Sequence, residues 1–82
     1  MYFLYILTCA DNTLYTGITT DVKRRFFEHV KGSASKYTRA KKPVKIIYTE
    51  KHKNRSTASK REAEIKKMTR PQKLALAQGY SF

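Results

Sequence analysis

The chain of 82 residues predicts a small α+β domain, a three-stranded antiparallel sheet flanked by helices in the order ββαβαα. Two segments rich in aromatic and β-branched residues, 2–8 and 13–18, lie on either side of a short polar link and predict a β-hairpin. Apolar residues at helical spacing follow, and a third strand-like segment precedes two more helical segments. A chain this short has room for one hydrophobic core, so we expect a single domain over residues 1–82.

The hairpin is expected to place its first strand at the centre of the sheet. Apolar side chains occupy both faces of that strand, Leu4 and Ile6 on one and Phe3, Tyr5 and Leu7 on the other. The link at 9–12, which reads Cys-Ala-Asp-Asn, contains turn-forming residues. The third strand is predicted at 44–48. Because it follows Pro43, which has no backbone N–H to donate, it suits an edge position or the start of a strand.

The first helix is predicted between the hairpin and Gly32, which ends it. Val22, Phe26 and Val30 recur at i, i+4 and i+8 and are expected to form its buried face. The polar residues 19–21, Thr-Thr-Asp, each have a side chain that can cap the helix start.

Two more helices are predicted after the third strand. The second is capped by Ser56 or Thr57 and runs to about Met68, and its buried face consists of Ala58, Ile65 and Met68. The third begins at Thr69, with a proline in its first turn. It is expected to pack through Leu74, Ala75 and Ala77 and to end at Gly79.

The formal net charge of +12 predicts a polyanionic partner. Nucleic acid is the most frequent partner of so basic a chain, and a highly charged surface that serves solubility is the alternative. An anionic membrane surface is disfavoured because no predicted helix has a clean apolar face. No apolar stretch reaches the ~20 residues of a membrane span. Cys9 is the single cysteine, so neither a disulfide framework nor a zinc site is expected, and we predict a cytoplasmic protein.

The first helix places an arginine and a histidine one turn apart. Arg25 and His29 both flank the apolar stripe, whereas Arg24 points to the opposite side. A guanidinium at that margin can grip a phosphate oxygen and stabilise developing charge, and a nearby imidazole can relay a proton. The alternative is an ordinary solvated arginine beside a half-buried histidine, and these residues alone favour that alternative.

Glu62 is the candidate metal ligand. It lies four residues after Ala58 and leans toward the packed face of the second helix, while Glu64 turns away. A carboxylate facing the sheet of so basic a chain is costly unless it holds a metal or another cation. A nuclease that uses Mg²⁺ or Mn²⁺ needs such a group near the scissile phosphate. The alternative is an ion pair with Arg61 or Lys66.

Tyr5 and Tyr15 lie on neighbouring predicted strands. A strand tyrosine is usually a core aromatic residue with a solvated hydroxyl. Near the cations of the first helix, however, a phenol can lose its proton more easily and act as a general base. The phosphate contacts of the nucleic acid are expected from a basic set that consists of Arg24, Lys36, Arg39, Lys41, Lys42 and Lys60.

Taken together, these residues make the chain resemble the GIY-YIG nuclease superfamily, and most closely its small single-domain bacterial members. The resemblance covers nearly the whole chain. It rests on residues 5–7 (Tyr-Ile-Leu), 14–19 (Leu-Tyr-Thr-Gly-Ile-Thr), Arg25 with His29, 36–39 (Lys-Tyr-Thr-Arg) and 60–67 (Lys-Arg-Glu-Ala-Glu-Ile-Lys-Lys). Each segment alone is common, and the combination is specific.

The resemblance implies an enzyme that cuts phosphodiester bonds with one divalent metal ion, Mg²⁺ or Mn²⁺. Tyr5 and Tyr15 would be the two motif tyrosines, with Tyr15 as the activator of the water. Arg25 would stabilise the phosphate, and His29 would assist that site. Glu62 would bind the metal.

The chain also departs from the pattern of the superfamily. Gly17 would be its motif glycine, which allows close approach of the backbone. Residues 3–5 read Phe-Leu-Tyr in place of Gly-Ile-Tyr, and Thr16 stands where the second motif has isoleucine. Many relatives have a functional asparagine after the metal-binding glutamate, and none follows Asn54 here. Most relatives also carry a separate targeting domain; we expect none here and expect a protein partner to supply targeting.

The leading hypothesis is therefore a metal-dependent endonuclease that acts on DNA, in repair or recombination. One alternative is a non-catalytic, basic nucleic-acid-binding module that keeps the fold. Another is a small accessory protein of an RNA assembly. The combined set of tyrosines, arginine, histidine and glutamate favours the enzyme, because binding alone does not require a carboxylate that faces the sheet.

Overall fold

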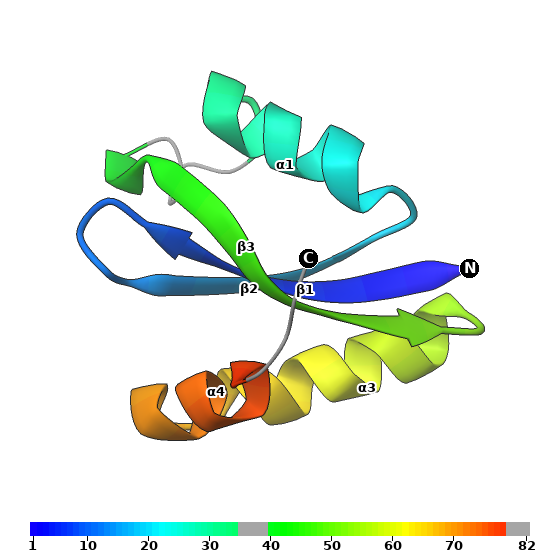
Figure 1. The fold of residues 1–82 in the computed structure, drawn as a ribbon. Coiled ribbons are helices and arrows are strands. Elements are labelled where there is room, and N and C mark those ends of the chain that lie inside the picture. Colours follow the sequence, from blue (N-terminus) through cyan, green and yellow to red (C-terminus); the bar gives the residue numbers. More distant parts are fainter. Residues whose placement is uncertain (35–39, 79–82) are drawn as a thin grey trace.

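The structure is a computed structural model that describes residues 1–34 and 40–78, and it confirms the predicted fold class. A three-stranded antiparallel sheet forms the middle layer (Figure 1). Helix α1 (Val22–Lys31) covers one face of the sheet, and α3 (Arg55–Lys66) covers the other together with α4 (Arg70–Ala77). The described elements follow one another in the predicted order ββαβαα.

Strand β1 (Tyr2–Cys9) lies between β2 (Leu14–Thr19) and β3 (Pro43–His52) and pairs antiparallel with both. The central position of β1 and the edge position of β3 are therefore confirmed. Strand β3 is longer than the predicted 44–48, because residues 49–52 continue to pair with the first half of β1. His52 is the last residue of this extension.

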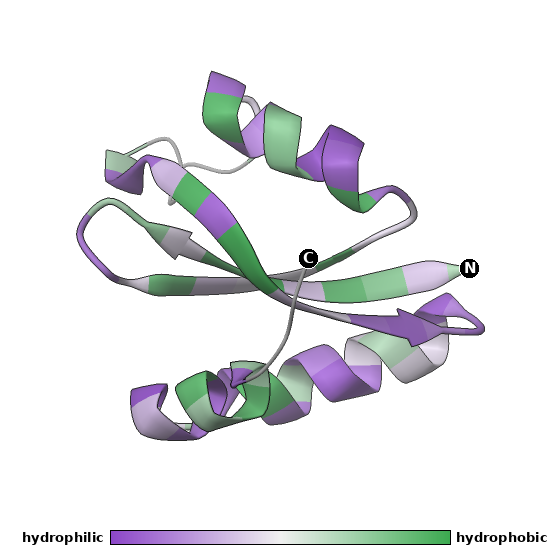
Figure 2. Cartoon of the chain, viewed as in Figure 1, coloured by the Kyte–Doolittle hydropathy of each residue, from purple (hydrophilic) through white to green (hydrophobic). Residues whose placement is uncertain are grey.

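The two faces of β1 carry separate apolar clusters, as the alternation of its side chains predicts. Leu4 and Ile6 pack with Ile65 of α3, and Tyr5 and Leu7 pack with Cys9 on the face toward α1. Figure 2 shows the hydrophobic colour along β1, whereas α3 is mainly hydrophilic. Because β1 is covered on both faces, loss of a side chain from either cluster would expose the centre of the sheet.

Helix α1 begins and ends where the sequence predicts. Asp21 caps it by accepting the backbone N–H of Arg24 at 3.0 Å, and Gly32 follows it with a left-handed φ of 82°. The predicted buried face is wrong at Val30, which is 54% exposed, while His29 is fully buried. At 100° per residue, position 29 returns to within about 20° of Val22, whereas position 30 lies about 80° away.

Helix α3 begins earlier than predicted. Asn54 is its cap and accepts the backbone N–H of Thr57 at 3.0 Å, so neither Ser56 nor Thr57 takes that role. Its predicted face is confirmed, since Ala58 and Ile65 are buried.

Helix α4 begins directly after Thr69, the residue at which it was predicted to start, and Thr69 is its cap, which exchanges hydrogen bonds with Gln72 in a capping box. Its packing differs from the prediction, because Leu76 contacts the core while Leu74 is 42% exposed. The predicted end at Gly79 lies outside the described residues. Among the helices that the structure describes, none is long and apolar enough to cross a membrane.

Candidate active site

The ring of Tyr5 lies against the backbone of Gly17. The two residues are register partners in β1 and β2. A Cβ atom added to Gly17 would stand 2.5 Å from the hydroxyl oxygen of Tyr5 and 2.7 Å from its Cζ. Since non-bonded atoms do not approach so closely, the missing side chain at position 17 is what leaves room for the phenol.

Three rings meet on the face of the sheet that α1 covers. The hydroxyl of Tyr5 and Nε2 of His29 form a buried hydrogen bond of 2.7 Å. The centroid of the Tyr15 ring lies 5.0 Å from that of His29 and 6.4 Å from that of Tyr5. Tyr5 is 1% exposed, whereas Tyr15 is only partly buried. Tyr15 is therefore the phenol of this pair that a substrate can reach.

Burial fixes the protonation states of Tyr5 and His29. It lowers the pKa of His29 to about 4, and the nearby charge of Arg25 acts in the same direction while Glu28 opposes it. Burial also raises the pKa of Tyr5 to about 12, although hydrogen bonding with Arg25 opposes this shift. Both groups are thus uncharged at neutral pH. The role of general base considered for the two tyrosines does not suit Tyr5.

Arg25 is held at the edge of the three rings with one donor left over. Its Nη1 donates to Oε1 of Glu28 at 3.1 Å, and Arg24 approaches the other oxygen of the same carboxylate at 3.6 Å. Nε of Arg25 is buried and has no hydrogen-bond partner among the described residues. Burial acts to lower the pKa of Arg25, but hydrogen bonds with Tyr5 and Glu28 outweigh it and raise that pKa. The guanidinium therefore stays charged.

Glu62 lies on α3 within electrostatic reach of this cluster. Its negative charge is one of the causes that raise the pKa of Tyr5. Its side chain is 24% exposed and forms an ion pair with Lys66 at 3.4 Å, which is one of the two alternatives considered for it. Arg61, the other alternative, pairs with Glu50 at 3.0 Å. Glu64 is 65% exposed, as helical geometry predicts.

The donors around Glu62 suit a cation that is bound together with a phosphate. Within residues 1–34 and 40–78, no group of three His, Cys, Asp or Glu gathers to form a metal cage. Mg²⁺ often takes one or two carboxylates and completes its shell with water and substrate phosphate. Lys66 is 56% exposed, and so exposed an ion pair is weak enough to be exchanged for a metal ion. The single carboxylate of Glu62 therefore fits Mg²⁺ or Mn²⁺, provided that water and a substrate phosphate complete the shell of the ion.

The basic residues predicted to bind nucleic acid come from several parts of the chain. Arg24 is exposed on α1, Lys60 is exposed on α3, Lys41 and Lys42 precede β3, and Lys36 and Arg39 lie outside the described residues. The amino group of Lys41 is 2.8 Å from Asp11, so part of its charge is neutralised within the protein. Lys42 is exposed and adopts a positive φ of 57°.

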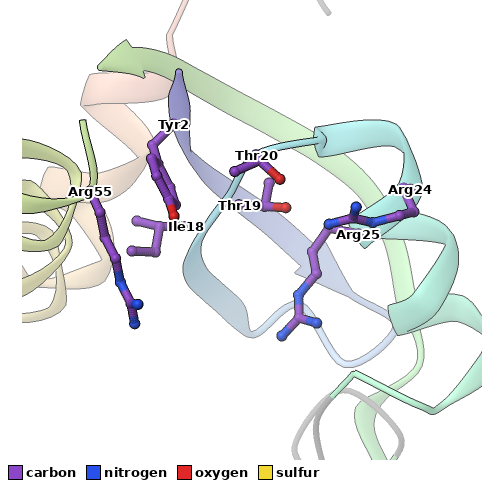
Figure 3. Close-up of a pocket in the computed structure, with 7 residues that line it drawn as sticks. All are labelled: Tyr2, Ile18, Thr19, Thr20, Arg24, Arg25 and Arg55. Atoms are coloured by element: carbon purple, nitrogen blue, oxygen red, sulfur yellow. The ribbon is translucent and has the colours of Figure 1, made fainter. Parts of the chain in front are cut away.

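A cavity of about 290 Å³ opens beside the edge strand β2 (Figure 3). We call it the arginine pocket, and its lining consists of Tyr2, Ile18, Thr19, Thr20, Arg24, Arg25 and Arg55. Figure 3 shows Tyr2 and Arg55 on one side and the two arginines of α1 on the other, with the threonines between them. Its described lining includes three guanidinium groups and no carboxylate.

Sequence reasoning missed three residues of this region. The spacing of Glu28 from Arg24 and Arg25 is that of helical ion pairs, so it could have been found. Tyr2 and Arg55 have no comparable local pattern. They line the same cavity because the first residues of β1 and of α3 lie close together in the folded chain.

Comparison with known proteins gives consistent matches. A family model described as the GIY-YIG catalytic domain matches residues 1–75. A UPF0213 protein of Natronomonas pharaonis is 49% identical over 72 residues, which cover 88% of this chain and 85% of that protein. A UPF0213 protein of Streptococcus agalactiae is 50% identical over 72 residues, which cover 88% and 82%.

A solved structure supports the same relationship. The solution NMR structure of a UPF0213 protein from Bacillus halodurans matches with a TM-score of 0.58 at 39% identity, covering 93% of this chain and 82% of that chain. The similar proteins include archaeal as well as bacterial ones, so the predicted group is wider than bacteria. The family match extends from β1 into α4 and includes every residue of the candidate site. The chain therefore belongs to the GIY-YIG catalytic domain family.

Proposed function

We propose that this domain is an endonuclease that hydrolyses phosphodiester bonds in DNA with Mg²⁺ or Mn²⁺, in DNA repair or recombination. Membership of the GIY-YIG catalytic domain family supports a nuclease-type reaction, and the net charge of +12 suits a nucleic-acid substrate. The observation that carries the proposal is the cluster in which Tyr5, Tyr15 and His29 contact one another beside the charged Arg25.

Tyr15 is the residue that we assign to the attacking water. A positioned phenol can orient a water molecule by hydrogen bonding, and as a phenolate, after its own proton has passed to solvent, it can accept the proton of that water as the attack proceeds. Tyr5 is the buried neighbour that supports Tyr15. Its pKa of about 12 keeps it protonated at neutral pH. His29 hydrogen bonds to Tyr5 and meets the Tyr15 ring edge-on at 65°, so it positions both phenols.

Arg25 would bind a non-bridging oxygen of the scissile phosphate. Glu28 holds Nη1 of the guanidinium, and Arg25 also lines the arginine pocket, from which a phosphate oxygen can approach it. A charged donor in a partly buried site stabilises the charge that develops in the transition state more strongly than it could in water.

Glu62 would hold the divalent ion, which supplies positive charge to the phosphate and the leaving oxygen when bound. To do so, the carboxylate exchanges its ion pair with Lys66 for the metal. Glu62→Gln keeps the size of the side chain and removes its charge, so Mn²⁺ binding measured by calorimetry in the presence of DNA should be lost while the fold remains. Glu64→Gln is the matched control on the exposed side of the same helix, and an equal loss in both variants would contradict the assignment.

The decisive experiment incubates the purified protein with labelled duplex, single-stranded and branched DNA, with and without Mg²⁺ or Mn²⁺. Cleavage should require the metal. Arg25→Ala should lower kcat by about 10²-fold, the size expected when one charged transition-state donor is removed. The double variant Tyr15→Phe with Arg25→Ala should be little worse than the worse single variant, because groups that act as a unit lose activity non-additively.

Arg24→Ala is the matched control, since its side chain is 56% exposed and should mainly weaken binding. Absence of cleavage with every substrate and both metals would contradict the proposal. Cleavage that survives Arg25→Ala undiminished would show that the site is wrongly assigned.

The alternative of a non-catalytic nucleic-acid-binding module keeps one observation in its favour. Glu62 is already paired with Lys66 at 3.4 Å. Such a module would bind DNA equally well with metal and with a chelator, and Glu62→Gln would leave that binding unchanged.

A further inference from the structure

We propose that the arginine pocket binds the phosphate group next to the one that is cut, together with part of its nucleoside. The proposal deepens the proposed function and rests on it for the identity of the strand. It assigns a binding role to Tyr2 and Arg55, which belong to neither the three-ring cluster nor the metal site.

The charges around the pocket call for an anion. Arg24 and Arg25 share the single carboxylate of Glu28. Arg55 is exposed and forms no ion pair with a carboxylate among the described residues. Like charges that face one cavity repel one another, and a bound anion turns that repulsion into attraction. Guanidinium groups suit a phosphate in particular, because their paired N–H groups match two of its oxygens.

The shape and lining of the pocket suit a nucleotide better than a free ion. Its volume of about 290 Å³ is larger than a phosphate alone requires, and it approaches the lower limit of pockets that hold small organic ligands. One wall carries the phenol ring of Tyr2 beside Ile18 (Figure 3). Aromatic rings of this kind bind the bases and sugars of flexible strands without regard to sequence.

The position of the pocket links it to the proposed reaction. Arg25 belongs to both places, since it lines the pocket and also interacts with the hydroxyl of Tyr5. In Figure 3 the side chains of Arg25 and Arg55 extend in the same direction from opposite sides of the cavity. A strand whose scissile phosphate lies at Arg25 can therefore continue toward Arg55 with its next phosphate.

The test uses binding rather than cleavage. Thymidine dinucleotide with a 5′-phosphate carries two phosphates one nucleotide apart, and it is titrated into ¹⁵N-labelled protein with EDTA present. We expect shifts of the amide resonances of Thr19 and Thr20 and of the Nε–H signals of Arg25 and Arg55. The same dinucleotide without its 5′-phosphate should bind more weakly.

Arg55→Ala should weaken binding of the phosphorylated dinucleotide by about tenfold, the loss expected for one charge-assisted hydrogen bond. The affinity of Arg55→Lys should lie between those of the wild type and Arg55→Ala, because lysine keeps the charge but lacks the paired N–H groups of a guanidinium. Lys45→Ala is the matched control, since it removes one exposed charge from β3 at the other edge of the sheet. An equal loss in Arg55→Ala and Lys45→Ala, or shifts spread over all basic surfaces, would overturn the proposal.

Cleavage kinetics separate this proposal from the nuclease proposal. Arg55→Ala should raise KM and leave kcat within about twofold, because it removes binding that is shared by ground state and transition state. If the dinucleotide binds in the pocket but no DNA is cleaved, the proposed binding role of the pocket is supported and the proposed nuclease activity is contradicted. If DNA is cleaved but Arg55→Ala changes neither KM nor the affinity for the dinucleotide, the proposed role of the pocket is contradicted and the nuclease proposal stands.

Discussion

The phenol of Tyr5 fills the space in which a side chain at position 17 would lie, and this contact ties a backbone position to the chemistry of the site. Gly17→Ala should push the ring away and break its hydrogen bond with His29. We expect a loss of about 1–3 kcal/mol in the free energy of unfolding, the usual cost of overpacking, together with a loss of DNA cleavage. Urea denaturation measures the first and the cleavage assay measures the second.

A double variant serves as the control for this contact. If the clash with Tyr5 causes the loss, Gly17→Ala should cost less in a Tyr5→Ala background than in the wild type, because contacting residues are not additive. Equal costs in the two backgrounds would mean that the backbone at position 17, and not the ring, is the cause.

His29 should make stability depend on acid. Its pKa of about 4 in the folded chain lies below the ordinary value of about 6.5, because burial disfavours the charged imidazole. The unfolded chain therefore takes up a proton first as the pH falls. The contribution of His29 is fully present above pH 6.5 and is lost between about pH 6.5 and 4, by about 3 kcal/mol in total.

Denaturation by urea at pH 7, 5.5 and 4 measures this loss. His29→Asn keeps a polar group of similar reach and removes the titration, so its stability should fall less steeply over the same range. A slope as steep as that of the wild type would assign the acid sensitivity to the carboxylates.

The residues of the site differ in how far the sequence could reveal them. Tyr5 and Tyr15 lie near each other as expected, because their strands are neighbours. Arg25 comes close to Tyr5 because α1 packs on the same face of the sheet. The full burial of His29 was missed, because the spacing of apolar residues at i, i+4 and i+8 predicts that Val30 lies on the buried face. The ion pair of Glu62 with Lys66 was one of two open alternatives, and the choice depended on Glu50, which lies on β3 and pairs with Arg61.

At the scale of elements, a polar cluster joins β3 to α3. Nε of Arg61 donates to both oxygens of Glu50 at 3.1 and 3.0 Å, and Tyr48 donates to the same carboxylate at 2.6 Å. His52 adds a contact at 3.0 Å. The side chain of Glu50 is only 18% exposed. Since α3 is mainly hydrophilic, this cluster supplements the few apolar contacts that hold the helix to the sheet.

Arg61→Ala should therefore destabilise the protein more than an ordinary surface substitution. It leaves the carboxylate of Glu50 half-buried without its main cation, and we expect a loss of about 1–3 kcal/mol. Thermal denaturation checks this against Lys60→Ala, which removes a neighbouring exposed charge from the same helix and should change the melting temperature little. Similar effects of the two variants would mean that the cluster contributes no more than a surface ion pair.

The ends of the helices show which local patterns were sufficient. Asp21 was one of three candidate caps for α1, Thr69 was predicted as the start of α4, and Gly32 was predicted as a stop for its backbone freedom. Asn54 was missed because two other capping residues follow it closely. In α4, Leu76 packs instead of Leu74, and this depends on the angle at which the helix meets the sheet. That angle is a property of the folded chain, not of the segment.

At the scale of the whole molecule, the charge of +12 should dominate the affinity for DNA. The longest dimension is 29 Å, which spans about eight base-pair steps at 3.4 Å per step. If about five phosphates are neutralised, the logarithm of the binding constant should fall with the logarithm of salt concentration with a slope of about −4 to −5 on duplex DNA. Fluorescence anisotropy between 50 and 200 mM salt, in the presence of a chelator, measures this slope, and an affinity that does not change over the range would contradict the electrostatic model.

The fold class and the family followed from order and composition, which belong to the whole chain. The arginine pocket did not, because it exists only where the start of α3 comes close to the end of β2. Long-range contact of this kind leaves no periodic pattern in the sequence. Tyr2 and Arg55 therefore look like ordinary terminal residues of a strand and a helix until the chain is folded.

Helix α1 carries Arg25 and His29 toward the sheet and leaves Phe27 and Val30 59% and 54% exposed to solvent. Most of the free energy that holds a helix to its domain comes from buried apolar surface. In α1 part of the buried face consists of Arg25 and His29, so less apolar surface is buried. We expect α1 to open locally while the sheet and α3 stay folded, so that its amide hydrogens exchange with solvent faster than those of β1. Each such opening would separate the guanidinium and imidazole from the tyrosines, and a DNA strand bridging α1 and α3 would hold the helix closed.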